Sequence, residues 1–383
     1  MIKTRDDLDR LILNKVPEGK TLEYKRQLPG REDGGNVKIL QSITSFANTN
    51  GGELLYGVEA EDGIPIGLPG IDALSTDAIQ LRIENLCKDG VQERLPHLSF
   101  NFISVDNCKS VLVIRIPKSW ASPHRVTVGE HAHFYGRKTG SYRMDVSELR
   151  SAFSLSQSVA EKARGFRSAR LEKILANDAP VPISTAGKLV LHVMAASAFD
   201  DATGAGVVPT AAQRSMFAPI GWVQGSSHLN FDGYVSYYGY GTPTVSYTQQ
   251  FRSGIVESML TFEKFSNEND FYLSPEWYEI RLIQNVESYI TALEELGSSS
   301  PYFVFLSFLG ISDYRFLTSS TGNFPTRRLD RDNLILPTVT IEDKQHVNSS
   351  MRALFDMVWN AFGLEKSKYF NDASQWIGPP ISL

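Results

Sequence analysis

The stretch that decides the fold of the first half of the chain is SITSFANTNGGELLYGVE, residues 42–59. Apolar residues recur at helical spacing in and just before it: Val37, Leu40, Ile43 and Ala47. We expect this helix to end at the Gly51–Gly52 pair. The residues after the glycines alternate as a strand does and lead into a hairpin whose turn is Asp62–Gly63. A helix that feeds a hairpin in this way indicates a domain of mixed α and β structure.

The composition is that of a water-soluble globular protein. The chain has 383 residues, of which 42% are hydrophobic and 21% charged, so it can form two or three packed domains. Its two cysteines, Cys87 and Cys108, lack metal-binding spacing, and neither a zinc site nor a disulfide is expected. The charged start and the absence of a long apolar run predict a cytoplasmic protein without a membrane span. The net charge of -5 argues against indiscriminate coating of nucleic acid.

Two domains of α+β type are expected. Residues 1–155 form the first, residues 156–186 a helix and linker, and residues 187–383 a second domain of α/β or α+β type. In the first domain we predict helices at 5–14, 37–50 and 72–88, and a long helix that a capping box of Asp145 and Glu148 opens. In the second domain we predict strands at 188–196, 244–251 and 301–311, and helices at 252–263, 275–296 and 347–362.

A short strand near the N-terminus carries a possible site. In TLEYK, residues 21–25, period two sends Leu22 and Tyr24 to the core and Glu23 and Lys25 to the open face. Glu18 lies just upstream. Two carboxylates with a lysine can hold a divalent cation and neutralise a phosphate, whereas the alternative is a solvated Glu–Lys pair. On an open face, Glu23→Gln is expected to leave stability nearly unchanged.

Five elements, in order and spacing, resemble the Schlafen-type AlbA-like DNA-binding domain over residues 4–155. They are Glu18 with LEYK, SITSFANTNGGELLYGVE, GIPIGL, SPH at 122–124, and FYGRKTGSYRMDVSELRSAF at 134–153. The most specific of them is SFANTNGG followed by an apolar strand and GV. The resemblance implies an α+β domain that binds nucleic acid.

The resemblance also implies a chemistry. Schlafen-type proteins bind tRNA, rRNA or single-stranded DNA, and some cut RNA with three acids and Mn²⁺ or Mg²⁺. Glu18, Glu23 and Lys25 match the E-x4-E-[FY]-K pattern that supplies two of these acids. The family's third acid falls in a Gly-Val-Asp-Asp segment, from which this chain departs with GVEA at 57–60. Glu59 becomes the candidate, ahead of Glu61 and Asp62, which are otherwise ordinary residues of the hairpin turn. The implied metal ligands are Glu18, Glu23 and Glu59, with Lys25 beside the phosphate.

A basic stretch between Lys109 and Arg143 favours nucleic-acid binding independently of the family resemblance. Glu130 is the single acidic residue among its lysine, arginine, histidine and tyrosine side chains. The stretch could line a groove for the phosphate backbone or form a solvated strand edge. The candidate nucleic-acid contacts are Lys25, Arg26, Arg115, Lys118, His124, Arg125, Arg137, Lys138, Tyr142 and Arg143.

Two main functional interpretations remain open at this stage. The first is a metal-dependent endoribonuclease, with bacterial antiphage defence as one pathway. The second is a non-enzymatic DNA-binding transcriptional regulator whose C-terminal domain senses a ligand or partner. A divergent ATP-binding protein is a minor alternative, since STAGKLV resembles the end of a phosphate loop but has Pro182 and Leu189 at positions that need glycine and Ser or Thr.

The family pattern occurs once, so we expect a homodimer or higher oligomer in which two basic faces flank one groove. The helix at 347–362 carries an apolar stripe that could join the two chains or pack within its own domain: Met351, Leu354, Phe355, Val358 and Phe362. The tyrosine-rich run YVSYYGYG, 234–241, is either a ligand-binding loop or a glycine-bent hairpin.

Overall fold

A computed structural model describes residues 2–72, 75–96, 98–106, 108–199, 208–222, 225–239, 243–262, 271–317 and 327–378. The chain divides into two compact units, 1–158 and 159–383. Helix α4 (Val146–Leu175) begins in the first and ends in the second. Both units combine sheets with helices, which confirms the predicted α+β class. No helix in the described part of the chain has the length and apolar composition needed to cross a bilayer.

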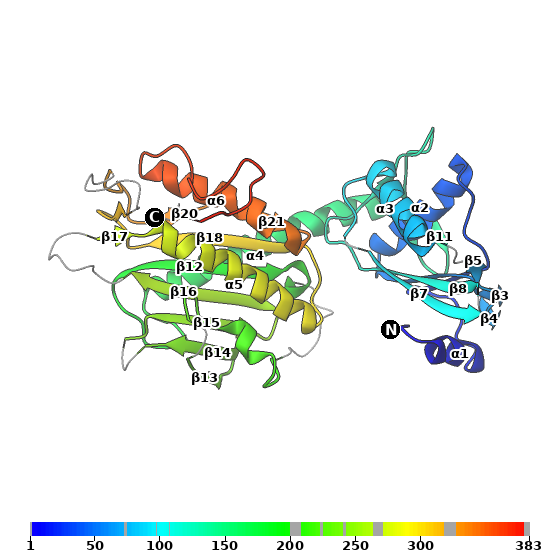
Figure 1. Ribbon diagram of the computed structural model, residues 1–383, viewed down its shortest axis with the longest axis horizontal. Coiled ribbons are helices and arrows are strands. Elements are labelled where there is room, and N and C mark those ends of the chain that lie inside the picture. Colours follow the sequence, from blue (N-terminus) through cyan, green and yellow to red (C-terminus); the bar gives the residue numbers. More distant parts are fainter. Residues whose placement is uncertain are drawn as a thin grey trace. The chain divides into compact units, whose positions relative to one another are not determined.

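Unit 1 contains two sheets and a separate hairpin (Figure 1). The main sheet has the order β1-β2-β8-β5, with β7 also paired to β8, and its strands are β1 (Leu22–Lys25), β2 (Gly52–Tyr56), β5 (Ile71–Asp72), β7 (Ser99–Asp106) and β8 (Lys109–Ile116). The small sheet has the order β11-β10-β9-β6, from β6 (Val91–Gln92), β9 (Arg125–Val126), β10 (His133–Arg137) and β11 (Ser141–Arg143). The hairpin is β3 (Glu59–Glu61) with β4 (Ile64–Gly67). Within the main sheet, β1 and β2 run parallel.

Helix α2 (Asp33–Ala47) packs against both sheets. One side, including Ile43 and Phe46, packs on the main sheet, and the other buries Leu40 against Val126 and Tyr135 of the small sheet. Helix α3 (Thr76–Gly90) joins the first of these clusters, while α1 (Arg5–Leu13) covers the opposite face of the main sheet. Because α2 is buried on two sides, it needs apolar residues on more than one face, and its sequence has them.

The turn after α2 agrees with the prediction from the glycine pair. Gly51 has φ +69, a left-handed conformation that favours glycine, and its N–H donates to the carbonyl of Phe46 at 2.8 Å. Asn48, the residue that ends the helix, reaches the small sheet: its Nδ2 donates to the carbonyls of His124 and Tyr135 at 3.1 and 2.9 Å. The SFANTNGG stretch therefore both ends the helix and connects it to the second sheet.

Unit 2 is built on an eight-stranded antiparallel sheet of order β13-β14-β15-β16-β12-β18-β20, with β21 also paired to β18. Its strands are β12 (Gly187–Ala195), β13 (Ser226–Leu229), β14 (Gly233–Tyr238), β15 (Ser246–Phe251), β16 (Ile255–Phe262), β18 (Tyr302–Leu309), β20 (Leu334–Ile335) and β21 (Val339–Ile341). The tyrosine-rich run lies largely on β14, as a hairpin strand rather than a loop, and residues 240–241 of it lie outside the described residues.

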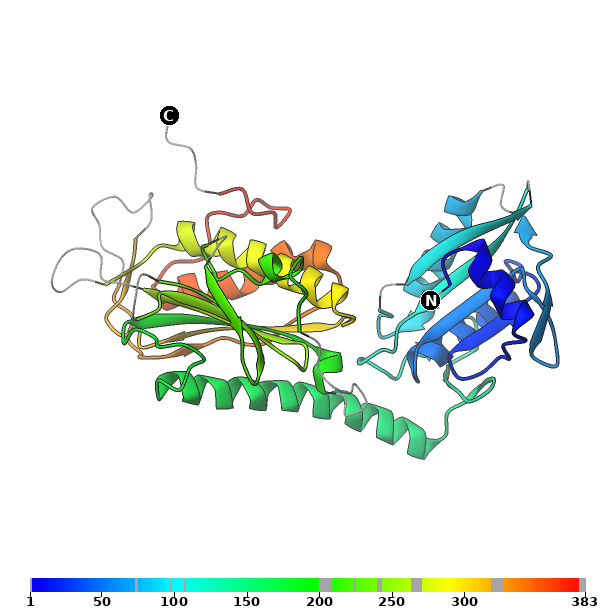
Figure 2. The same cartoon turned by 90° about the horizontal axis from the view of Figure 1, so that it is seen from below.

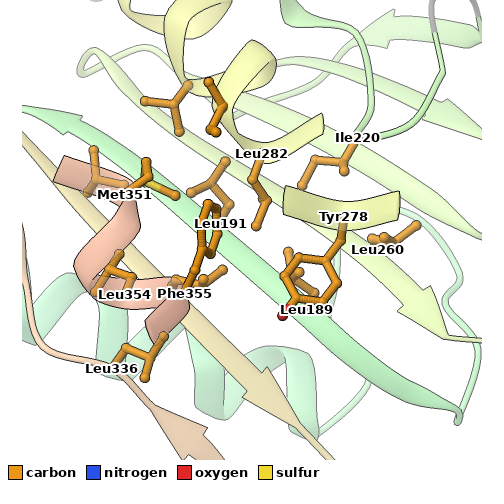
Figure 3. Close-up of a cluster of buried hydrophobic side chains, with 14 of the residues drawn as sticks. Leu189, Leu191, Ile220, Leu260, Tyr278, Leu282, Leu336, Met351, Leu354 and Phe355 are labelled. Carbon is orange, nitrogen blue, oxygen red and sulfur yellow. The ribbon is translucent and has the colours of Figure 1, made fainter. Parts of the chain in front are cut away.

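Helices cover both faces of this sheet (Figure 2). Odd-numbered residues of β12, such as Leu191, pack against α5 (Pro275–Glu295) and α6 (Val347–Ala361). Figure 3 shows Leu191, Leu282 and Phe355 pointing toward one another in this layer. Even-numbered residues of β12, such as Val190, pack against the C-terminal half of α4. All nine residues of β12 are consequently buried.

Three expectations for the second half need comment. The helix predicted at 252–263 is wrong, because Ile255–Phe262 forms the central strand β16, which is buried along its whole length and so lacks alternation. The segment expected as a linker is part of unit 2, where Val181 is buried and the carbonyl of Pro182 accepts from Thr244. The apolar stripe of α6 packs inside its own unit, so it cannot join two chains, and the dimer stays a prediction.

A carboxyl group is buried in the helical layer of unit 2. Glu279 of α5 has no exposed surface; its Oε1 accepts from Trp359 Nε1 at 2.8 Å and its Oε2 from the Ser367 hydroxyl at 2.9 Å. Burial raises the pKa of Glu279 to about 7, although these two hydrogen bonds oppose the rise. The carboxyl group therefore titrates close to neutral pH in the folded protein.

This raised pKa predicts that unit 2 loses stability as the pH rises. Between the ordinary value of 4.5 and about 7, the folded chain keeps a proton that the unfolded chain has released. The contribution of Glu279 to the free energy of unfolding is fully present below pH 4.5. It decreases by on the order of 3 kcal/mol as the pH rises to about 7. Urea unfolding of the native protein and of Glu279→Gln from about pH 5 to about pH 8 checks it. We expect a flatter profile for the variant, and parallel profiles would contradict the prediction.

Candidate nucleic-acid interface

A buried ion pair joins the two sheets of unit 1. Arg137, the last residue of β10, places Nη1 2.7 Å from Glu23 Oε2 of β1, and the two side chains are 1% and 7% exposed. The Arg137 Nε donates to the carbonyl of Gly19 at 3.0 Å, and the guanidinium lies 4.1 Å from the centre of the Phe46 ring. Arg137 is thus a buried cross-link between the two sheets, and its expected contact with phosphate stays a prediction.

Glu23 is buried, contrary to the open face expected for it. It shares its face of the main sheet with Leu54, which packs against α2. Its second oxygen, Oε1, lies 2.7 Å from Lys25 Nζ, and the Lys25 side chain is half exposed. Both carboxylate oxygens of Glu23 are thus paired with cations of the same chain.

The other two predicted acids have separate partners. Glu18 precedes β1 and reaches this strand, where its Oε1 accepts from the backbone N–H of Tyr24 at 2.7 Å. Glu59, at the start of β3, forms an ion pair with Arg26, whose Nη1 lies 2.7 Å from Oε1. Both members of this pair are accessible to solvent.

These acids do not fit a three-carboxylate metal site as they are placed. A magnesium or manganese ion requires oxygen atoms converging on one point. Over the residues that the structure describes, no group of three or more His, Cys, Asp or Glu side chains is arranged to hold a metal. The assignment of Glu18, Glu23 and Glu59 as metal ligands, and of Lys25 beside them, stays a prediction from the resemblance.

His124 is also internal. It has no exposed surface, its Nδ1 lies 3.0 Å from the carbonyl of Glu93, and its backbone N–H donates to Asn48 Oδ1 at 2.7 Å. Burial lowers the pKa of His124, which favours the neutral ring. This histidine supports the junction between α2 and the small sheet rather than a ligand surface.

The remaining predicted contacts do not share one surface. Arg115 is exposed on β8, two residues after Val113, and so faces the α1 side of the main sheet. Lys118 lies 4.2 Å above the Trp120 ring. Arg125 is half-buried on β9. Because β9 pairs with β10, Arg125 lies near the cations of the β10–β11 hairpin, which form the main positive group.

A groove of about 450 Å³ lies between the N-terminal half of α2 and the β10–β11 hairpin. Its lining residues are Gly34, Val37, Lys38, Gln41, His131, Tyr135, Tyr142 and Arg143. Lys38, His131 and Arg143 are exposed, and the lining includes no acidic side chain. The groove therefore combines positive charge with aromatic rings.

Local contacts fix the shape of this groove. Gln41 Nε2 donates to the Ser141 hydroxyl at 2.9 Å, which ties α2 to the hairpin. The Tyr142 ring crosses Gly136, where a Cβ atom would lie 3.0 Å from it. The Tyr142 hydroxyl donates to Glu148 at 2.7 Å, and Lys138 Nζ lies 4.9 Å from the ring centre. Tyr142 is thus held by its neighbours before any ligand binds.

Positive charge is concentrated around the hairpin. Partial burial and the positive charges of Arg143, His131 and Arg125 lower the pKa of His133. A histidine resists protonation when cations already surround it. The same field favours an anion at this surface.

The contacts predicted from the sequence omit His131 and two polar residues of α2, Lys38 and Gln41, all of which line the groove. Lys38 and Gln41 belong to the helix. They are three positions apart on α2 and so lie on one helix face. The signal was present, since these polar residues interrupt the apolar positions of a helix that is otherwise buried. The spacing of the apolar residues predicts only the buried side of this helix, so it does not indicate a binding role for its polar positions.

Residues 18–145 match the protein family described as Schlafen, AlbA_2. The chain carries a Schlafen AlbA_2 domain. This confirms the resemblance and associates unit 1 with nucleic-acid binding. The match does not extend beyond residue 145.

Similar solved structures include the DIP2311 protein from Corynebacterium diphtheriae, with 19% identity, a TM-score of 0.26, and coverage of 39% of this chain. This chain spans 28% of that protein's length. Another is the N-terminal domain of an ATP-dependent DNA helicase RecG-related protein from Nitrosomonas europaea, with 21% identity and a TM-score of 0.23. The similarity extends over 31% of this chain and over 74% of that domain. No curated protein matches the sequence.

The buried pair of Arg137 and Glu23 generates a stability prediction. Glu23→Gln keeps the shape of the side chain but leaves the buried guanidinium without its counter-charge. We expect the free energy of unfolding of the Schlafen AlbA_2 domain to fall by about 3 kcal/mol. Denaturant titration with hydrogen exchange read on peptides of unit 1 measures this change.

Glu59→Gln is the matched control, because it removes the same charge from a solvent-accessible pair with Arg26. An exposed pair of this kind contributes about 1 kcal/mol or less. Equal losses of unfolding free energy in the two variants would contradict the prediction, because burial of the Glu23–Arg137 pair would then add nothing to stability.

Proposed function

We propose that the Schlafen AlbA_2 domain binds single-stranded RNA or DNA in the groove between α2 and the β10–β11 hairpin. The observation that supports this most is the grouping of Lys38, His131 and Arg143 around one acid-free groove. Lysine and arginine side chains neutralise phosphates and release counterions, which provides affinity without sequence preference. Because the chain is acidic overall, we expect nucleic acid to bind at this local basic groove rather than over the whole surface.

Exposed rings in the groove favour an unpaired strand. His131 is exposed and Tyr142 is half-buried, and both lie among the cations. Bases of a single strand can stack on such rings, whereas the bases of a duplex already stack on one another. Lys138, whose ammonium lies over Tyr142, adds a further positive charge beside the groove.

Replacing Lys38 and Arg143 together by alanine tests the groove. Both side chains are exposed, so the fold should survive. We expect weaker binding to single-stranded RNA, and a plot of log affinity against log salt that is shallower by about 1.4, the value for two lost phosphate contacts. Fluorescence anisotropy with labelled oligonucleotides at several salt concentrations measures both effects.

The control removes Lys3 and Arg10, which lie at α1 on the opposite face of the main sheet. This variant has the same change in net charge, so it separates the groove from a general effect of charge. Equal loss of affinity in the two double variants would place the nucleic acid elsewhere.

Metal-dependent cleavage of tRNA or rRNA is the finer proposal that the resemblance carries. The positions of Glu18, Glu23 and Glu59 favour the non-enzymatic alternative, a nucleic-acid-binding regulator, because each acid is engaged by a different partner. Carboxylates repel phosphate unless a cation lies between them. Binding therefore needs only the groove, while cleavage needs a rearrangement of the acids.

Incubation of the purified protein with tRNA, rRNA and single-stranded DNA, with Mn²⁺ or with a chelator, separates the two activities. We expect binding in both conditions and no cleavage in either. Fragments that form with Mn²⁺, disappear with the chelator and disappear in Glu18→Gln would contradict this expectation and establish the endoribonuclease.

A further inference from the structure

Unit 2 contains a pocket of about 460 Å³ that nucleic-acid binding by unit 1 does not use. It lies where β16 ends and α5 begins, and its walls include Trp222, Phe262, Tyr272, Ser274, Trp277 and Leu317. Tyr272 belongs to β17 (Tyr272–Leu273), which pairs with β19 (Arg315–Phe316) just before Leu317. The volume is in the usual range for a small-molecule site.

Two tryptophans of this pocket, Trp222 and Trp277, pack against neighbouring side chains of unit 2. Trp222 stacks on Tyr238 with ring centres 4.5 Å apart and an interplanar angle of 21°. Trp277 carries the guanidinium of Arg281 at 4.2 Å from its ring, and the two tryptophans meet edge to face at 6.1 Å. Rings fixed in this way present flat walls without further ordering, which lowers the cost of binding a flat molecule.

The chemistry of the lining limits the ligand. No charged side chain is among the described residues that line the pocket, so these residues offer no counter-charge to a phosphate or carboxylate group. Hydroxyl groups among the lining residues include those of Tyr272 and of Ser274, the N-cap residue of α5, whose side chain makes no capping hydrogen bond. Hydroxyl groups beside aromatic and aliphatic walls suit a ring that carries one or two hydrogen-bonding atoms.

We propose that this pocket binds a small molecule built on a flat, uncharged aromatic or heteroaromatic ring of the size of a nucleoside. The ring lies against Trp222 and Trp277, and the Ser274 hydroxyl bonds to an atom at its edge. This function is independent of the groove in unit 1 and gives unit 2 a ligand-binding role.

Saturation-transfer NMR on the full chain, with adenosine, uridine and indole as separate probes, tests the proposal. We expect at least one probe to bind, with a dissociation constant of roughly 10 µM to 1 mM, the range for ligands of this size. Trp222→Leu should weaken that binding roughly 5- to 100-fold through loss of stacking. The absence of binding by all three probes would overturn the proposal.

A matched pair of variants shows whether the pocket is the site. Leu317 lines the pocket and is 46% exposed, so Leu317→Trp can fill the pocket at little cost to the fold. Leu229, 50% exposed on β13, pairs with Tyr234 toward the other end of the sheet, so Leu229→Trp is the control. Binding should be lost in the first and kept in the second. Equal binding in both variants would overturn the proposal, and both should bind RNA as the native protein does.

Discussion

The buried guanidinium of Arg137 is the interaction on which the Schlafen AlbA_2 domain depends most. It bonds to Glu23 of the main sheet and to the carbonyl of Gly19, and it lies over Phe46 of α2, while its own strand belongs to the small sheet. A buried cation is costly unless a carboxylate and further acceptors surround it. The two sheets and α2 must therefore meet in one arrangement, and this arrangement forms the groove beside the β10–β11 hairpin.

This constraint changes the meaning of the residues that carry the family resemblance in this chain. Glu23 neutralises Arg137, Glu18 accepts from the backbone of β1, and Asn48 connects α2 to the small sheet. Each of them has a structural explanation that does not involve a substrate. A sequence pattern can thus identify the domain correctly and still leave its chemistry undecided, because the same acids can hold a metal or balance a buried arginine.

The sequence was sufficient for elements whose burial differs between their sides. Apolar spacing and the glycine pair predicted α2 and its end, and the capping box of Asp145 and Glu148 is present, with Glu148 N–H donating to Asp145 Oδ1 at 2.9 Å. The spacing of apolar residues gave the wrong prediction for β16, which was expected to be a helix. A strand that is covered on both faces shows no alternation of polar and apolar residues. For the candidate site, the sequence did not show which charged residues are buried. Arg137 and His124 are internal, whereas Lys38 is exposed.

Helix α4 shows how a charged residue can fix an element to each unit separately. In unit 1, Glu148 of its first turn accepts from Tyr142, a residue of the groove. In unit 2, Arg170 binds both oxygens of the fully buried Glu257 at 2.8 Å, and His192 and Tyr247 bond to the same carboxylate. Burial alone would raise the pKa of Glu257, yet the bonds from Arg170 and His192 lower it to about 2. That carboxylate stays ionised at neutral pH, so the C-terminal half of α4 is fixed to its sheet by charge as well as by apolar packing, whatever happens at the groove.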